Sequence, residues 1–146
     1  MYLCGHSMGA PVSIQLAASD PTLFEKIIIV AGSIDASQET TEYWRKLMNI
    51  KPFYWLLPGA FGPSNTELLY LKKDLIPLQK EFSKIRCKVY FIHGDKDDWV
   101  PIKNVAYGMK MLINAKSVTA DTIFGADHQI PWKNKSEFTK LLLNIY

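Results

Sequence analysis

The segment Gly5-His6-Ser7-Met8-Gly9 places one serine between two glycines. This spacing is typical of a sharp turn from a strand into a helix, where the serine hydroxyl is exposed and the glycines relieve crowding. Free N–H groups at the start of the following helix would face negative charge that develops beside the serine. We therefore expect Ser7 to be a nucleophile and the Met8 N–H to be an oxyanion donor. The alternative is a serine that only caps a helix.

The segment His93–Pro101 carries three carboxylates, Asp95, Asp97 and Asp98, directly after an apolar run over residues 88–92. Such a run predicts a buried strand, and ligand sites in open parallel sheets gather where the strands end. Any of the three acids could orient a histidine, and position alone does not separate them. The alternative for this segment is an acidic turn without a chemical role.

A serine nucleophile needs a base, and histidine suits that role near pH 7. The chain has three histidines. We expect His6, inside the glycine-flanked turn, to point away from the site, and His93 ends a predicted strand. His128 follows Gly125 in a loop after the last predicted strand and is free to enter a site. A lone loop histidine would usually be a surface residue, so this expectation depends on the serine and the acid.

Strand-like and helix-like segments alternate along the chain. A short apolar stub, Tyr2–Cys4, opens the sequence directly before the glycine-flanked serine, as if half a buried strand began the chain. We expect further strands over residues 26–30, 88–92 and 118–124, and helices over residues 8–19, 104–114 and 135–145. This alternation predicts an α/β fold with a mostly parallel sheet.

We divide the chain into three parts. Residues 1–32 and 84–146 would form one core, which carries the serine in its first part and the acid and base in its second. Residues 33–83 are too many for a structureless loop, and their prolines, glycines and aromatic residues predict a small helical cap.

Composition narrows the classes of function. The chain has 146 residues and a formal net charge of +3, too mild to predict a nucleic-acid partner. No apolar run reaches the length of a membrane span, and no motif predicts a metal or an organic cofactor. We expect Cys4 and Cys87 to be buried free thiols, which fits a reducing compartment, and we take the protein to be cytoplasmic.

Together these motifs resemble those of the α/β-hydrolase superfamily, in particular its esterases, lipases and other acyl hydrolases with a helical cap. The matching segments are Gly5–Ala10, His93–Pro101 in the pattern His-Gly-x-x-Asp-x-x-Val-Pro, and the Gly-Ala-Asp-His loop that ends at His128. They occur in the family's order of serine, acid and histidine. The resemblance implies a triad of Ser7 as nucleophile, Asp97 as acid and His128 as base.

The resemblance also implies a substrate and a partial fold. A hydrophobic acyl pocket would be lined by aromatic residues of the cap, namely Trp44, Phe53, Trp55 and Phe61, unless these only pack the cap itself. The family fold has eight strands in the spatial order 1-2-4-3-5-6-7-8, and Cys4 would end the fifth. Strands five to eight would then form a four-strand sheet, and the first four strands, with the second oxyanion donor, would precede this chain.

We therefore expect a serine hydrolase of carboxylic esters or related acyl substrates that works as part of a longer or split enzyme. Peptidase and acyltransferase chemistry stay open, because both can use the same triad. A serine instead of an aspartate in the turn argues against the family's haloalkane dehalogenases and epoxide hydrolases. The alternative is an inactive truncated fragment or an interaction module, which would pair with a missing N-terminal half or with itself through the edge of the fifth strand.

Overall fold

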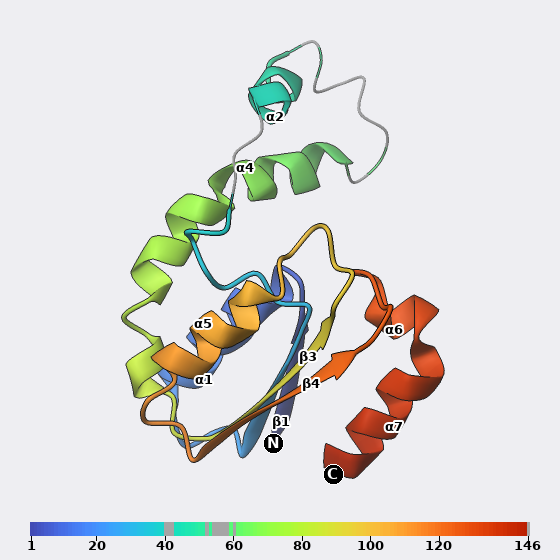
Figure 1. Ribbon diagram of the computed structural model, residues 1–146. Coiled ribbons are helices and arrows are strands. Elements are labelled where there is room, and N and C mark those ends of the chain that lie inside the picture. Colours follow the sequence, from blue (N-terminus) through green and yellow to red (C-terminus); the bar gives the residue numbers. More distant parts are fainter. Residues whose placement is uncertain (40–42, 52, 54–58, 60, 146) are drawn as a thin grey trace.

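The computed structural model describes residues 1–39, 43–51, 53, 59 and 61–145, without the side chains of residues 43–45 and 61. The described elements, in chain order, are β1 (Tyr2–His6), α1 (Gly9–Ser19), β2 (Lys26–Val30), α2 (Tyr43–Met48), α4 (Phe61–Leu78), the 3-10 turn η1 (Phe82–Lys84), β3 (Lys88–Gly94), α5 (Lys103–Met111), β4 (Ser117–Ile123), α6 (Ile130–Lys133) and α7 (Lys135–Ile145). Figure 1 shows their arrangement. None of the described helices is long and apolar enough to cross a bilayer.

The four strands form one parallel sheet in the order β1-β2-β3-β4, which confirms the predicted fold class. The register is in step across the sheet: Tyr2 pairs with Lys26, Lys26 with Lys88, and Lys88 with Ser117. Because the strands run in the same direction, all four carboxyl ends lie at the same end of the sheet. The loops that follow β1, β3 and β4 contain the candidate serine, acid and histidine.

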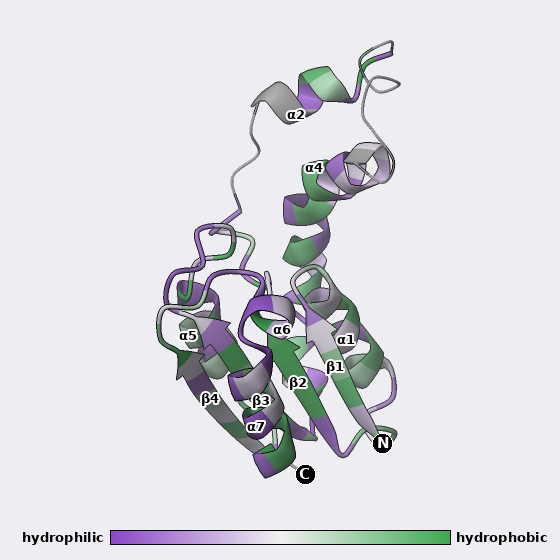
Figure 2. Ribbon diagram, turned by 90° about the vertical axis from the view of Figure 1, so that its right-hand side faces the viewer, coloured by the Kyte–Doolittle hydropathy of each residue, from purple (hydrophilic) through white to green (hydrophobic). Residues whose placement is uncertain are grey.

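Helices cover both faces of the sheet, so its central strands are buried on both faces (Figures 1 and 2). Ile27 and Ile29 of β2 belong to a hydrophobic cluster that also contains residues of α1 and α5, whereas Ile28 and Val30 belong to a second cluster with residues of α6 and α7. This two-sided burial explains why β2 reads as an unbroken apolar run, with no polar residue from Ile27 to Val30.

Strand β1 lies at the edge of the sheet and is less buried than β2. Within the described part of the chain its only strand partner is β2. The thiol of Cys4, which we expected to be buried, is exposed, whereas Cys87 is buried as expected. The prediction for Cys4 was wrong because an edge strand has a covered neighbour on one side only.

The segment predicted to be a cap is not uniform in its packing. Figure 1 shows α2 and the first part of α4 projecting from the sheet. The second part of α4 belongs instead to the main hydrophobic core, which contains Leu71, Leu75 and Leu78, and Phe82 follows them there. Residues 31–36, just after β2, are also buried. The three-part division of the chain stays a prediction, but both ends of residues 33–83 pack with the core.

Candidate active site

The turn between β1 and α1 holds Ser7 in a strained conformation. Its φ is +54°, a left-handed value that is uncommon for a residue other than glycine. Three backbone hydrogen bonds hold it there: the Ser7 N–H donates to the carbonyl of Val30 at 3.0 Å, and the Ser7 carbonyl accepts from the N–H groups of Ala10 at 3.1 Å and Ser33 at 3.4 Å. The hydroxyl is thereby presented at the carboxyl end of the sheet, as the sequence predicts for such a turn.

The two glycines of this turn differ in what they make room for. A Cβ atom at Gly5 would lie 2.3 Å from Ser13 Oγ and 2.4 Å from the Gly9 carbonyl oxygen, so the close approach of α1 to β1 requires glycine there. A Cβ atom at Gly9 would have no neighbour within 4 Å. Sterically, the turn therefore depends on its first glycine.

Three of the predicted residues lie in one hydrogen-bonded line. His128 Nε2 is 2.8 Å from Ser7 Oγ, and His128 Nδ1 is 2.8 Å from Asp97 Oδ2. Because a carboxylate only accepts hydrogen bonds, Nδ1 donates to Asp97, and neutral His128 then offers Nε2 as an acceptor to the serine hydroxyl. Asp97 is 8% exposed and His128 6%, so the hydrogen bond between them is shielded from water, whereas the one to Ser7 is partly buried.

The loop after β3 singles out Asp97 from its two neighbours. Asp97 Oδ1 accepts the backbone N–H groups of Trp99 at 3.0 Å and Val100 at 2.8 Å. Burial alone would raise the pKa of Asp97, but the hydrogen bonds from His128 and from these two N–H groups outweigh it and hold the pKa below its ordinary value. Asp95 instead accepts from the Gly125 N–H, and Asp98 is exposed. Asp97 is therefore an ionised partner for His128.

The other two histidines also lie at this site. His6 Nε2 donates to the backbone carbonyl of His128 at 2.9 Å, so the expectation that His6 points away was wrong. His93 Nε2 donates to the carbonyl of Val100 at 2.9 Å and is 3.5 Å from Asp97 Oδ2. Burial lowers the pKa of both His6 and His93, which favours their neutral forms.

The Met8 N–H lies next to the candidate nucleophile in the chain and has no described hydrogen-bond acceptor. Met8 directly follows Ser7 at the start of α1, with helical φ and ψ of −64° and −16°. Among the described residues no group accepts a hydrogen bond from this N–H. It is therefore available to an oxygen that approaches the serine, and its role as an oxyanion donor stays a prediction.

Within the described residues, the aromatic side chains beside the triad are not among those predicted to bind substrate. Phe53 is 39% exposed, Trp55 lies outside the described residues, and Trp44 in α2 and Phe61 at the start of α4 have no described side chain. Two other tryptophans do lie beside the site. The ring centroid of Trp99 is 5.2 Å from that of His128, and Trp132 is 5.2 Å from His6. They are 72% and 68% exposed.

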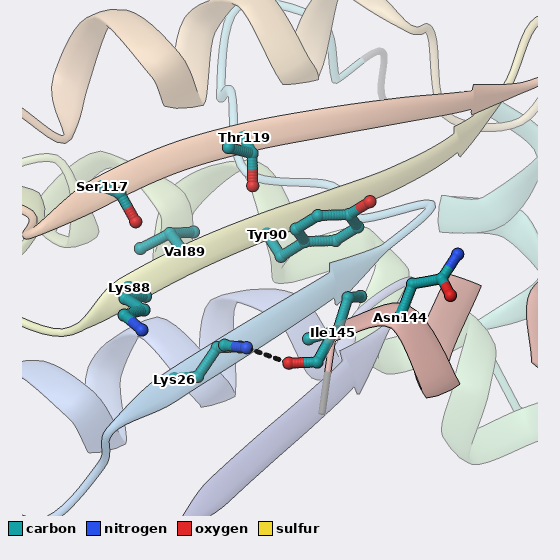
Figure 3. Close-up of a pocket in the computed structure, with 8 residues that line it drawn as sticks. All are labelled: Lys26, Lys88, Val89, Tyr90, Ser117, Thr119, Asn144 and Ile145. Carbon is teal, nitrogen blue, oxygen red and sulfur yellow. Dashed lines mark hydrogen bonds between the residues drawn. The ribbon is translucent and has the colours of Figure 1, made fainter. Parts of the chain in front are cut away.

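A pocket of about 200 Å³ lies away from the triad. Figure 3 shows the residues that line it: Lys26, Lys88, Val89, Tyr90, Ser117, Thr119, Asn144 and Ile145. They come from the first halves of β2, β3 and β4 and from the end of α7, whereas the triad follows the other ends of the strands. This pocket is therefore not the catalytic cleft. The described residues contain no cluster of three or more metal-ligating side chains.

Comparison with solved structures identifies the fold. The chain superposes on a monoacylglycerol lipase from Paleococcus ferrophilus with a TM-score of 0.71 at 18% identity, covering 98% of this chain and 66% of that one. A carboxylesterase from Nitrososphaera gargenis gives a TM-score of 0.68 at 18% identity, with 99% of this chain and 63% of that one covered. A bromoperoxidase from Bacillus anthracis gives a TM-score of 0.66 at 18% identity, with 97% of this chain and 65% of that one covered. No protein-family model and no curated protein matches the sequence.

All three neighbours are α/β-hydrolases, and the chain has part of the α/β-hydrolase fold, as the motifs predicted. It spans just under two thirds of the length of each of these structures. At 18% identity the likeness shows the fold alone, because one fold can carry many different activities.

Proposed function

We propose that this chain carries the catalytic triad of a serine hydrolase that cleaves carboxylic esters, with Ser7 as nucleophile, His128 as base and Asp97 as the acid that orients it. The observation that carries this proposal is the unbroken hydrogen-bonded line from Asp97 through His128 to Ser7, with 2.8 Å on each side of the imidazole. The strained Ser7 backbone adds to it, because a left-handed serine has no evident use in a plain helix cap.

The reaction follows from the order of these groups. Ser7 Oγ attacks the ester carbonyl carbon while His128 Nε2 takes its proton, and the Met8 N–H stabilises the negative oxygen of the tetrahedral intermediate. The bond to the alcohol oxygen then breaks, and His128 returns the proton to that oxygen. Water next attacks the acyl-serine, His128 takes a proton from the water, and the acid leaves as Ser7 regains its hydrogen. Asp97 stabilises the imidazolium in both halves.

The apolar part of the substrate would contact Trp99. This indole lies beside His128, is 72% exposed, and follows Asp97 by two residues. The solved neighbours named as a monoacylglycerol lipase and a carboxylesterase support an ester substrate of this kind. The cap residues Trp44, Phe53 and Trp55, with Phe61, remain candidates for the far wall of an acyl pocket.

We further propose that the active form contains strands beyond those of this chain, paired with the open side of β1. The edge position of β1 and the partial coverage of the solved neighbours support this. The strands would come from a further segment of the protein or from a separate chain, and they would bring the second oxyanion donor. The free thiols of Cys4 and Cys87 are consistent with a cytoplasmic location.

The same open edge favours the second candidate, an interaction module that pairs through β1 with another copy or another chain and has no catalytic activity. Both candidates use the same fold and differ only in whether Ser7 is reactive. The interaction module predicts a folded protein whose serine behaves like any surface hydroxyl.

A fluorophosphonate probe separates the two candidates, since it reacts with a serine that a neighbouring base activates. We expect labelling of the purified chain that is lost in Ser7→Ala, whose fold should be unchanged because the hydroxyl is the only group removed. Equal labelling of the chain and of Ser7→Ala, or none in a folded sample, would contradict an assembled triad in this chain and favour the interaction module.

A further inference from the structure

The imidazole of His6 contacts the residue proposed as the catalytic base. His6 is the last residue of β1 and directly precedes Ser7. Its Nε2 atom is 2.9 Å from the backbone carbonyl oxygen of His128. Its ring centroid is 5.0 Å from that of His128 and 5.2 Å from that of Trp132, whose ring is nearly perpendicular to it. The half-buried His6 ring therefore lies between the serine turn and the loop that contains His128.

The direction of this hydrogen bond follows from its partner. A carbonyl oxygen only accepts, so Nε2 of His6 carries the proton and donates. Because burial lowers the pKa of His6, the neutral ring is favoured. A neutral His6 also places no second positive charge beside His128 when His128 takes the proton of Ser7.

Few of the described hydrogen bonds connect the loop of His128 to the side of the sheet where Ser7 lies. This loop follows β4, at the opposite edge of the sheet from β1. Apart from the side-chain bonds of His128, the backbone of this loop is bonded to the segment after β3: the Ala126 carbonyl accepts from the Lys96 N–H, and the Gly125 N–H donates to Asp95. Within the part of the chain that the structure describes, the bond from His6 is the only one that joins the backbone of this loop to β1.

We propose that His6 is a positioning residue, whose hydrogen bond to the His128 carbonyl holds the imidazole of His128 within reach of Ser7. This inference rests on the proposed function and adds a residue to it. One end of the bond is covalently next to the nucleophile and the other is the backbone of the base, so the bond sets the distance between the two reacting side chains.

Two substitutions separate the hydrogen bond from the packing of the ring. His6→Phe keeps a ring between His128 and Trp132 but removes the donor. His6→Gln removes the ring but places an amide N–H as many bonds from Cα as imidazole Nε2, so it can still donate to the His128 carbonyl. The donor hypothesis therefore predicts that glutamine rescues and phenylalanine does not, and a packing role predicts the reverse.

The first measurement is the second-order rate constant of fluorophosphonate labelling at a temperature where all variants are folded. We expect His6→Phe to lower it about 10- to 100-fold, since a displacement of about 1 Å can cost about 100-fold. We expect His6→Gln to stay within about threefold of the original chain, within the usual spread for a hydrogen bond of similar geometry. Equal rate constants for the original chain and His6→Phe would overturn the proposal.

The second measurement does not depend on a reactive serine. The proton between His128 Nδ1 and Asp97 should give a far-downfield NMR signal, assigned by its loss in Asp97→Asn. We expect this signal to persist in His6→Gln and to broaden or vanish in His6→Phe. If Ser7 of the original chain is not labelled, the proposed function fails for this chain, and the NMR signal alone decides on His6. A signal unchanged in His6→Phe would then refute the positioning role.

Discussion

Replacing Asp97 by asparagine tests the proposed triad, because in the proposed mechanism Asp97 acts only through His128 and does not contact the substrate. Asp97 accepts at both oxygens: Oδ1 binds the N–H groups of Trp99 and Val100, and Oδ2 binds His128 Nδ1. In Asp97→Asn the amide oxygen can serve only one side. If it keeps the two backbone N–H groups, its NH₂ group faces Nδ1 and forces the neutral imidazole of His128 to carry its proton on Nε2, which then cannot accept from Ser7.

The magnitude follows from this change of tautomer. A base that carries its proton on the wrong nitrogen, and whose charged form has lost its carboxylate, loses about 10,000-fold in rate in other serine triads. At 1.36 kcal/mol per factor of ten this is about 5 kcal/mol of transition-state free energy. The fold should survive, because asparagine occupies nearly the same volume and still accepts the two backbone N–H groups.

The assay is the second-order labelling rate constant, with Asp98→Asn as the matched control. Asp98 is the next residue in the same loop, is exposed, and makes no described hydrogen bond, so its substitution should change the rate constant less than about twofold. A loss in Asp98→Asn as large as that in Asp97→Asn would show that loop charge, and not the line to His128, governs reactivity. A full rate in Asp97→Asn would refute the reasoning outright.

Three further predictions concern stability and substrate contact. Burial lowers the pKa of His93 from its ordinary value of 6.5, so below that pH the unfolded chain binds a proton that the folded chain does not. The free energy of unfolding should therefore be at its full value above about pH 6.5 and decrease as the pH falls. Urea midpoints measured against pH should decrease less steeply in His93→Gln. Gly5→Ala should lower the free energy of unfolding by about 1–3 kcal/mol, because the added methyl group would overlap with Ser13 and α1. Gly9→Ala should leave the free energy of unfolding unchanged or raise it by up to about 1 kcal/mol, because the methyl group there meets no neighbour. Equal effects of the two substitutions in thermal unfolding would contradict this. Trp99→Ala should slow labelling by a long-chain phosphonate about 3- to 10-fold more than labelling by a methyl phosphonate, because burial of the apolar group on the indole is lost; equal slowing of both would contradict a contact with the apolar group.

The strands and helices could be predicted because they depend on local pattern. The run Lys26–Val30 was predicted to be a strand with the bounds that the structure has, and so was the helix Lys135–Ile145. Strand β3 continues two residues beyond the prediction, through His93 to Gly94, because the register with β4 adds two more pairs. The short helix α6 (Ile130–Lys133) was not predicted, since four residues carry no period.

The contacts of the site were harder to predict. The choice of Asp97 over its neighbours came from the resemblance to a family, and the loop geometry that brings Asp97 to His128 is not visible in the residues alone. We expected His6 to point away from the site because of its place in the turn. The sequence does not show that the loop after β4, at the opposite edge of the sheet, lies within hydrogen-bond distance of His6. The one sequence signal for Trp99 was its place two residues after Asp97, close enough to share the same loop.

The spacing of the parallel strands explains why this site needs three loops. The ends of β1 and β3, which the loops of Ser7 and Asp97 follow, are two strand spacings apart, roughly 10 Å. The side chains of Ser7 and Asp97, with the imidazole of His128 hydrogen-bonded to each at 2.8 Å, bridge that distance. The imidazole comes from the loop after β4, which has to reach back across the ends of its neighbours. A slip of one residue in the register would displace a strand end by about 3.3 Å, more than either hydrogen bond can absorb. The in-step register of the sheet is therefore as much a part of the proposed catalytic apparatus as the three side chains.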